Sequence, residues 1–229
     1  MTGQEASAAA GGAARGWDKA AGKPTTTLLL RHGATELSAE RRFSGRDDIA
    51  LTKEGIRQAR LAARRLAAGP GVDVIVTSPL QRARRTAEAV AEATGAPMIV
   101  DDDLAEADFG QWQGLSFAEA SQRWPDELAA WQASPDAAPP GGESFAMVAL
   151  RVLSAMDRLI KAHQHCSAVV VSHVTPIKTV ICRAMLAPPA AMFRFHLDLA
   201  SLTEIDWFAD GPALVRSLND TAHLGGLGG

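Results

Sequence analysis

The stretch LLLRHGATE, Leu28 to Glu36, carries an apolar segment directly into an arginine, a histidine and a glycine. Together with the threonines before it, the segment from Thr26 to Leu30 predicts a buried strand. Gly33 gives the backbone freedom for an unusual turn or a close approach. Taken alone, the stretch leaves open whether Arg31 and His32 form a site or lie in an exposed loop.

Strands and helices alternate along the rest of the chain. Strands are predicted at 26–30, 72–77, 98–100 and 168–171, with helices that begin near residues 53, 79, 117, 144 and 176. A hairpin is predicted from Ser201 to Phe208 and from Ala213 to Leu218, with its turn at Asp210-Gly211. Because several of the strands are apolar throughout, the pattern predicts an α/β fold. We expect a three-layer α/β/α sandwich with a mostly parallel central sheet and a C-terminal hairpin.

The composition limits the class of protein. The chain has 229 residues, of which 47% are hydrophobic and 21% charged, enough for one sizeable core. Its net charge of −3 gives no general attraction for nucleic acid or an anionic membrane. No apolar run reaches the roughly eighteen residues of a membrane span, and the N-terminus lacks the hydrophobic segment of a signal peptide. We therefore expect a cytoplasmic protein that binds neither membrane nor nucleic acid.

The two ends of the chain differ from the middle. Residues 1–24 are rich in alanine, glycine and serine and are expected to form a flexible linker or tail. Residues 225–229 are glycine-rich and are expected to be a disordered tail. The segment 25–224 is then a single folded domain.

Polar residues follow the predicted strands at one edge of the sheet. In parallel sheets, ligands bind beyond the C-terminal ends of the strands. His173 follows the most apolar strand, Arg82 opens the helix after the second strand, and Glu106 lies beyond the third. Since two histidines at the ends of separate strands suggest a shared pocket, we expect Arg31 and His32 to lie there as well.

This set of side chains suits phosphoryl transfer. The planar guanidinium group of arginine can bind two phosphate oxygens at once and neutralise their charge without a metal. A neutral histidine can attack phosphorus and form a phosphohistidine, which divides the reaction into two easier steps. A second histidine, if cationic, stabilises charge on the transferring group. A carboxyl group beside the phosphate is favoured in its protonated form and can protonate the leaving oxygen.

Short motifs that carry these residues occur in a fixed order. They are RHGAT at 31–35, RFSG at 42–45, LTKEGIRQA at 51–59, SPLQRA at 78–83, LAE at 104–106, FG at 109–110 and SH at 172–173. The ordered set resembles the histidine phosphatase superfamily, also called phosphoglycerate-mutase-like. The resemblance covers the chain from Thr25 to about Leu224, which implies one histidine phosphatase domain.

The resemblance implies a role for each site residue. His32 would be the phosphorylated nucleophile and Glu106 the proton donor, with His173 as a second catalytic histidine. No metal and no cofactor are implied. Ser38 stands where many relatives have asparagine, and Val174 where glycine is usual. The phosphate would be held by Arg31, Arg82, His173, Thr35 and Ser38.

The branch of the superfamily is indicated by the segment after Glu106. Phosphoglycerate mutases carry a longer insertion there, whereas here Gly114 leads quickly into the helix at Ser116. The chain thus resembles the phosphatases, especially α-ribazole phosphatases and the acid phosphatase domain of bifunctional ribonuclease H/acid phosphatase proteins. The resemblance implies a metal-independent phosphomonoesterase of the acid phosphatase type, acting on a small phosphorylated metabolite, with α-ribazole phosphate as a candidate.

Several alternatives stay open. A mutase-type phosphoryl transfer and a non-catalytic module that binds a phosphorylated ligand are the rival functions. An upstream ribonuclease H domain, absent from this chain, and a homodimer are also open. Arg84 and Arg85 are expected to form a solvated helix face. Trp112 is the best candidate for lining a substrate mouth, while Trp124 and Trp131 are expected to be packing residues.

Overall fold

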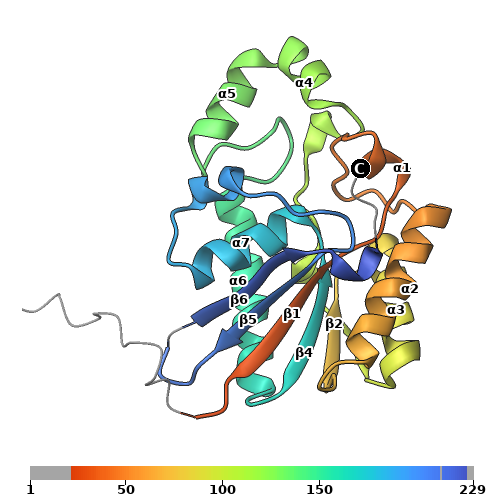
Figure 1. Cartoon of the computed structure of the whole chain (residues 1–229). Helices are drawn as coiled ribbons and strands as arrows, with labels where there is room; N and C mark the ends of the chain where they lie inside the picture. The colour runs from red at the N-terminus through yellow and green to blue at the C-terminus, as the bar shows by residue number, and fades with distance from the viewer. Residues whose placement is uncertain (1–21, 212, 226–229) are drawn as a thin grey trace, which may run out of the picture.

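A six-stranded sheet organises the part of the chain that the structure describes (Figure 1). The computed structural model describes residues 22–211 and 213–225. The strand order is β3-β2-β4-β1-β5-β6, parallel from β3 to β1 and antiparallel from β1 to β6. The strands are β1 (Thr25–Arg31), β2 (Val74–Thr77), β3 (Met98–Val100), β4 (Ser167–Ser172), β5 (Leu202–Trp207) and β6 (Ala213–Asp220).

The two central strands, β1 and β4, are apolar on both faces. Side chains alternate between the two faces of a strand, so neighbouring residues enter different cores. Leu29 and Val170 belong to one hydrophobic core, and Leu30 and Val171 to the other. A sheet that is buried on both sides needs helices on both faces.

Four long helices cover the sheet (Figure 1). The helices α2 (Lys53–Ala67) and α3 (Gln81–Thr94) pack on one face, and α6 (Phe145–Ala162) and α7 (Val174–Ala184) on the other. This arrangement confirms the predicted three-layer sandwich, the mostly parallel sheet and the C-terminal hairpin formed by β5 and β6. Thr52 caps α2 as predicted, because its hydroxyl accepts a hydrogen bond from the Gly55 amide at 3.0 Å.

Shorter elements stand over the C-terminal edge of the sheet (Figure 1). The helix α1 (Glu36–Ala39) follows β1 there, and α4 (Phe117–Arg123) and α5 (Pro125–Ala133) project beyond it. Ser116 forms the predicted capping box with Glu119 at the start of α4. The short 3-10 helices are η1 (Asp102–Leu104), η2 (Gly110–Trp112), η3 (Pro189–Arg194) and η4 (Ala222–Leu224).

Two predicted helix starts were displaced. The helix α7 begins at Val174, so that Pro176 lies in its first turn. A proline is tolerated there because the amide hydrogen that it lacks would have no partner within the helix. The helix α3 begins at Gln81 rather than at Pro79. Among the described residues, no helix is both long enough and apolar enough to span a bilayer. The predicted tails fall mostly outside the described residues, at 1–21 and 226–229.

Candidate active site

The backbone at the end of β1 explains why the chain needs Gly33. A side-chain carbon on Gly33 would lie 2.3 Å from the carbonyl oxygen of Gly55, and one on Gly55 would lie 2.1 Å from the carbonyl oxygen of Ala34. These distances are too short for any side chain, so the two glycines allow the start of α2 to pack directly on the His32 loop. The close approach predicted for Gly33 is confirmed.

His32 is buried and is held in one tautomer. Its Nδ1 lies 2.7 Å from the carbonyl oxygen of Gly33. Because a carbonyl can only accept a hydrogen bond, Nδ1 carries the proton and Nε2 keeps its lone pair. Burial lowers the pKa of His32 well below its ordinary value, and the charges of Arg82 and Arg31 lower it further. The ring is therefore neutral, with Nε2 available as a nucleophile.

His173 lies beside His32, with 5.1 Å between the ring centroids. Its Nε2 is 2.7 Å from the hydroxyl of Ser78, and its Nδ1 is buried without a hydrogen-bond partner. Burial lowers the pKa of His173 well below its ordinary value, followed by the charges of Arg82, His32 and Arg31. With only the protein's own charges around it, His173 is neutral; a phosphate dianion beside it would favour the cation.

The two arginines keep part of their hydrogen-bonding capacity free. Arg31 donates through Nη1 to the carbonyl of Leu197 at 2.6 Å. Arg82 is fully buried and donates to the carbonyls of Gly45 at 2.7 Å and Asp47 at 2.8 Å. The Nε atom of each arginine is buried without a hydrogen-bond partner. Arg82 thus holds the loop around residues 44–47 in place and still has a donor to offer.

Three unpartnered nitrogens therefore belong to the residues that surround His32. Arg31, Arg82 and His173 each contribute one, and each interacts electrostatically with one or both of the others. Buried polar atoms in proteins normally have partners, so such a cluster calls for a ligand that supplies acceptors. A phosphoryl group, with three peripheral oxygens and a negative charge, has the matching chemistry.

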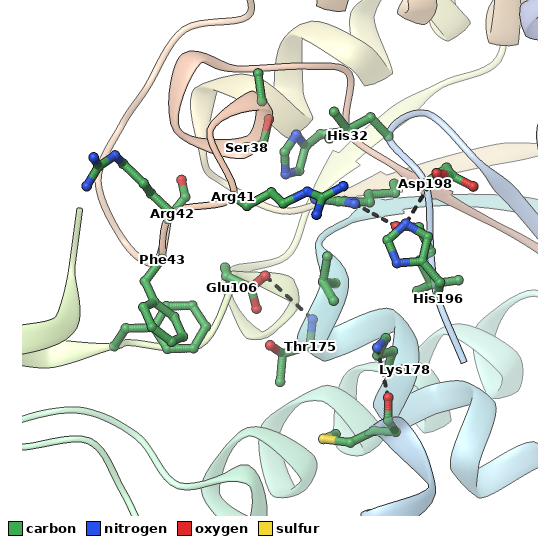
Figure 2. A pocket seen from close by; sticks show the side chains of 18 of the residues that line it. His32, Ser38, Arg41, Arg42, Phe43, Glu106, Thr175, Lys178, His196 and Asp198 are labelled. Carbon is green, nitrogen blue, oxygen red and sulfur yellow. Dashed lines mark hydrogen bonds and ion pairs between the residues drawn. The ribbon is translucent and has the colours of Figure 1, made fainter. Parts of the chain in front are cut away.

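Glu106 enters the same pocket from the loop after η1 and is only 5% exposed. One carboxylate oxygen accepts a hydrogen bond from the Ala107 amide at 2.8 Å. The other lies 3.5 Å from the amide of Thr175 in the first turn of α7, as Figure 2 shows. The start of α7 and the Glu106 loop thus meet beside His32.

The Glu106 loop is fixed from behind by a partly buried ion pair. Arg151 donates to the carbonyls of Ala105 at 2.6 Å and Glu106 at 3.1 Å, and its Nε donates to Glu143 at 3.0 Å. Glu143 also accepts a hydrogen bond from the amide of Asp108 at 2.9 Å. The residues before and after Glu106 are therefore anchored to Arg151 on α6 and to Glu143 just before that helix.

Glu143 makes the stability of this anchor depend on pH. Burial alone would raise its pKa, but hydrogen bonds from Arg151, the Asp108 amide and Arg46 outweigh burial and lower the pKa from 4.5 to about 2. A carboxyl group whose pKa is lowered by folding stabilises the folded protein at pH values above its pKa in the unfolded chain. That stabilisation is lost as the pH falls towards 2. The contribution is about 3 kcal/mol at neutral pH.

We expect Glu143→Gln to lower the free energy of unfolding by about 3 kcal/mol at pH 7, and by about 1 kcal/mol less at pH 3.5. Urea unfolding at the two pH values measures the difference. The exposed Glu92, changed to Gln, is the matched control and should have little effect at either pH. A loss of unfolding free energy that is the same at both pH values would contradict the role given to the Glu143 carboxylate.

A cavity of about 1250 Å³ opens beside these residues. One side is polar and includes Arg31, His32, Ser38 and Glu106. The lining also includes an aromatic wall of rings that contact one another, which consists of Phe43, Phe109, Trp131, Phe145 and Phe193. The cavity beside His32 is therefore lined by both polar and aromatic side chains.

The expectation for Trp112 was wrong, whereas Trp124 and Trp131 take part in the packing of the hydrophobic core as expected. Trp112 is fully buried and does not line the cavity, whereas Trp131 does. Trp112 lies with its ring edge-on to Trp131, at 5.5 Å between centroids. It therefore supports the wall from behind. Nearness to Glu106 in sequence did not reveal which ring faces the cavity, because the helix α5 brings Trp131 there from further along the chain.

Thr35 and Ser38 are engaged with each other. The Thr35 hydroxyl accepts a hydrogen bond from the Ser38 amide at 3.2 Å and so caps α1. The Ser38 hydroxyl accepts one from the Thr35 amide at 2.8 Å. Ser38 lines the cavity, while the side chain of Thr35 is buried in the cap. A phosphate contact by either residue stays a prediction.

Sequence reasoning did not select several residues that line the cavity. They are Arg41, Gln58, Thr175, Lys178, His196 and Asp198. The signal for Lys178 was its spacing from Thr175, which places both residues on the same face of a helix. Among the described residues, no group of three or more His, Cys, Asp or Glu side chains is arranged to hold a metal ion.

Known proteins resemble this chain over most of its length. A bifunctional protein of Mycobacterium tuberculosis is 48% identical over 209 residues, which are 91% of this chain and 57% of that protein. Phosphoserine phosphatase 1 of Hydrogenobacter thermophilus is 33% identical over 199 residues, 86% of this chain and 93% of that protein. The structure of the α-ribazole phosphatase of Shigella flexneri superposes with a TM-score of 0.76 at 29% identity, covering 86% of this chain and 96% of that one.

These similarities confirm the resemblance to the phosphatase branch and support a phosphoric monoester hydrolase. The chain spans little more than half the length of the mycobacterial relative, 57% of it. The model of the histidine phosphatase superfamily (branch 1) matches residues 27–221, which include all of the proposed site residues. Because this family match covers most of the chain, including the proposed site residues at the sheet edge, the chain belongs to the histidine phosphatase superfamily.

Proposed function

We propose that this protein is a metal-independent phosphomonoesterase of the acid phosphatase type that works through a phosphorylated His32. The observation that carries the proposal is a neutral His32 with a free Nε2 lone pair, set among three buried nitrogens that lack hydrogen-bond partners. A nucleophile and a group of oxygen-binding donors at one point are what a phosphoryl transfer needs.

In the first step, Nε2 of His32 attacks the phosphorus of the ester. A P–N bond forms as the P–O bond to the leaving group breaks. Glu106 in its protonated form gives its proton to the departing oxygen, so the product leaves as a neutral alcohol. Arg31 and Arg82 neutralise the peripheral oxygens, and His173 shares this role once the phosphate dianion has favoured its cation.

In the second step, water attacks the phosphohistidine. The Glu106 carboxylate accepts a proton from the water, the P–N bond breaks, and inorganic phosphate leaves with His32 restored to its neutral form. The Gly33 carbonyl keeps the proton on Nδ1 throughout, so the lone pair of the restored ring again belongs to Nε2. The open cavity beside His32 supports access for water and therefore hydrolysis rather than mutase-type transfer.

The proposed substrate is a small phosphorylated metabolite. Phosphate would occupy the polar end of the cavity, and the remainder of the molecule would lie along the aromatic wall. The relatives suggest two candidates, α-ribazole phosphate and phosphoserine. A cytoplasmic location, a homodimer and an upstream ribonuclease H domain remain predictions from the sequence.

Initial rates on a panel of phosphomonoesters test the proposal. The panel includes both candidates and both phosphoglycerates, each measured with and without excess chelator. We expect release of inorganic phosphate that the chelator does not reduce. Isomerised phosphoglycerate with little free phosphate would favour the mutase alternative, and binding of esters without turnover would favour the ligand-binding module.

A further inference from the structure

A lysine that plays no part in the phosphoryl transfer lies in the wall of the cavity. Lys178 is half-buried on α7, three residues after Thr175 and four after Val174. This spacing places all three on one face of the helix, and all three line the cavity. Figure 2 shows Lys178 on α7, below and to the right of Thr175.

The groups in direct contact with the Lys178 ammonium are neutral. Its Nζ donates to the carbonyl of Met192 at 2.8 Å and lies 5.2 Å from the centre of the Phe195 ring. Within the described part of the chain, Lys178 forms no ion pair with a carboxylate at 4.0 Å or less. Burial and the charge of Arg31 lower its pKa, while Cys182 and Glu106 act in the opposite direction. A partly buried cation that makes no direct ion pair favours an anionic ligand.

The position of Lys178 relative to the phosphate end is set by α7. The Thr175 amide in the first turn faces Glu106, and Lys178 follows about 4.5 Å further along the helix axis. Glu106 would protonate the leaving oxygen, so the side of the cavity beyond Glu106 receives the leaving group. Lys178 thus lies where a substituent close to the ester oxygen would be placed.

We propose that Lys178 binds a carboxylate on the leaving group, so that the preferred substrates are phosphomonoesters with a carboxylate near the ester carbon. This inference rests on the proposed phosphatase function. An ammonium group has three donors, and Met192 takes one, which leaves two for the two oxygens of a carboxylate. An ester without an acidic group, such as α-ribazole phosphate, leaves this cation unpaired and should be a poorer substrate.

Two pairs of esters test the assignment. The pairs are 3-phosphoglycerate with glycerol 3-phosphate, and phosphoserine with phosphoethanolamine. The second member of each pair has a hydroxymethyl group or a hydrogen atom, respectively, in place of the carboxylate. We expect the wild type to prefer the carboxylate member of each pair by about 10-fold or more in kcat/KM, since a hydrogen bond to a charged group has an effect of this size.

The variant Lys178→Gln removes the charge but keeps a donor that can reach the Met192 carbonyl. We expect it to lower kcat/KM for the carboxylate members by about 10- to 100-fold, chiefly through KM. The other two esters should change by no more than about twofold, and Lys178→Arg should keep most of the preference. Lys53→Gln, on the exposed start of α2, is the matched control.

Each other outcome overturns the assignment in a recognisable way. Equal losses on both members of a pair would mean that Lys178 only supports η3 against α7. A wild type with no preference would remove the carboxylate site and leave the phosphatase function standing. If none of the four esters releases phosphate, the proposed function fails and the inference fails with it.

Discussion

Replacing His32 with alanine is expected to abolish phosphate release while the protein stays folded. The neutral ring supplies the attacking Nε2, and none of the other residues at the site has a lone pair in that position. Loss of a covalent nucleophile typically lowers kcat by about 10⁴-fold or more. Initial rates, together with a circular dichroism spectrum and a thermal unfolding curve, measure the two parts of this expectation.

His165→Ala is the matched control for that variant. His165 precedes β4, at the opposite end of the strand from His173 and the site. This control should turn over at the rate of the wild type. If the folded His32→Ala protein keeps its turnover number, His32 is not the nucleophile.

Changing Glu106 to glutamine is expected to slow esters with poor leaving groups the most. Glutamine has the same shape but only one oxygen, so it can keep just one of the two backbone hydrogen bonds that the Glu106 oxygens accept from the Ala107 and Thr175 amides. It also has no acidic proton to give. General acid catalysis contributes about 10²- to 10⁴-fold, so alkyl phosphates should lose that much in kcat. An aryl ester such as p-nitrophenyl phosphate leaves without protonation and should lose far less.

The comparison between the two classes of ester is the control within that experiment. A purely positional role for Glu106 would slow both classes by the same factor. Equal slowing would therefore count against the proton-donor assignment, even though the variant is impaired.

The sheet edge on which the site lies could be predicted from local sequence. Two apolar strands can be recognised from their sequence pattern, and they end in Arg31-His32 and Ser172-His173. Because the strands are parallel, their C-terminal ends lie at the same edge of the sheet and face the crevice. The register pairs Arg31 directly with Ser172, so the two histidines must follow side by side. No contact from elsewhere in the chain was needed for that conclusion.

The partners of the site residues could not be predicted, because they come from distant segments. Arg82 donates to the carbonyl of Gly45, which lies 37 residues earlier in the chain. Glu106 is anchored by Arg151, 45 residues later. Such contacts depend on how loops pack over the sheet, and the periodicity of a sequence carries no information about them.

The charge of His173 is a further point that sequence left open. The sequence predicted that His173 stabilises the transferring group if its ring is cationic, and left the charge of the ring open. With the protein's own charges alone, the pKa of His173 is lowered, first by burial and then by Arg82. The imidazolium that would stabilise the transferring group is thus favoured only beside a phosphate. Burial of the ring decides this, and burial is a property of the folded chain.

The most direct test of the account is to trap the phosphorylated enzyme. A ³²P-labelled ester is mixed with the protein, the reaction is stopped by rapid quenching in alkali, and the labelled peptide is identified. We expect label on His32, attached at Nε2 and stable to alkali but lost in acid, with none in the His32→Ala protein. Label on another residue, or steady release of phosphate by an enzyme that never carries label, would contradict it.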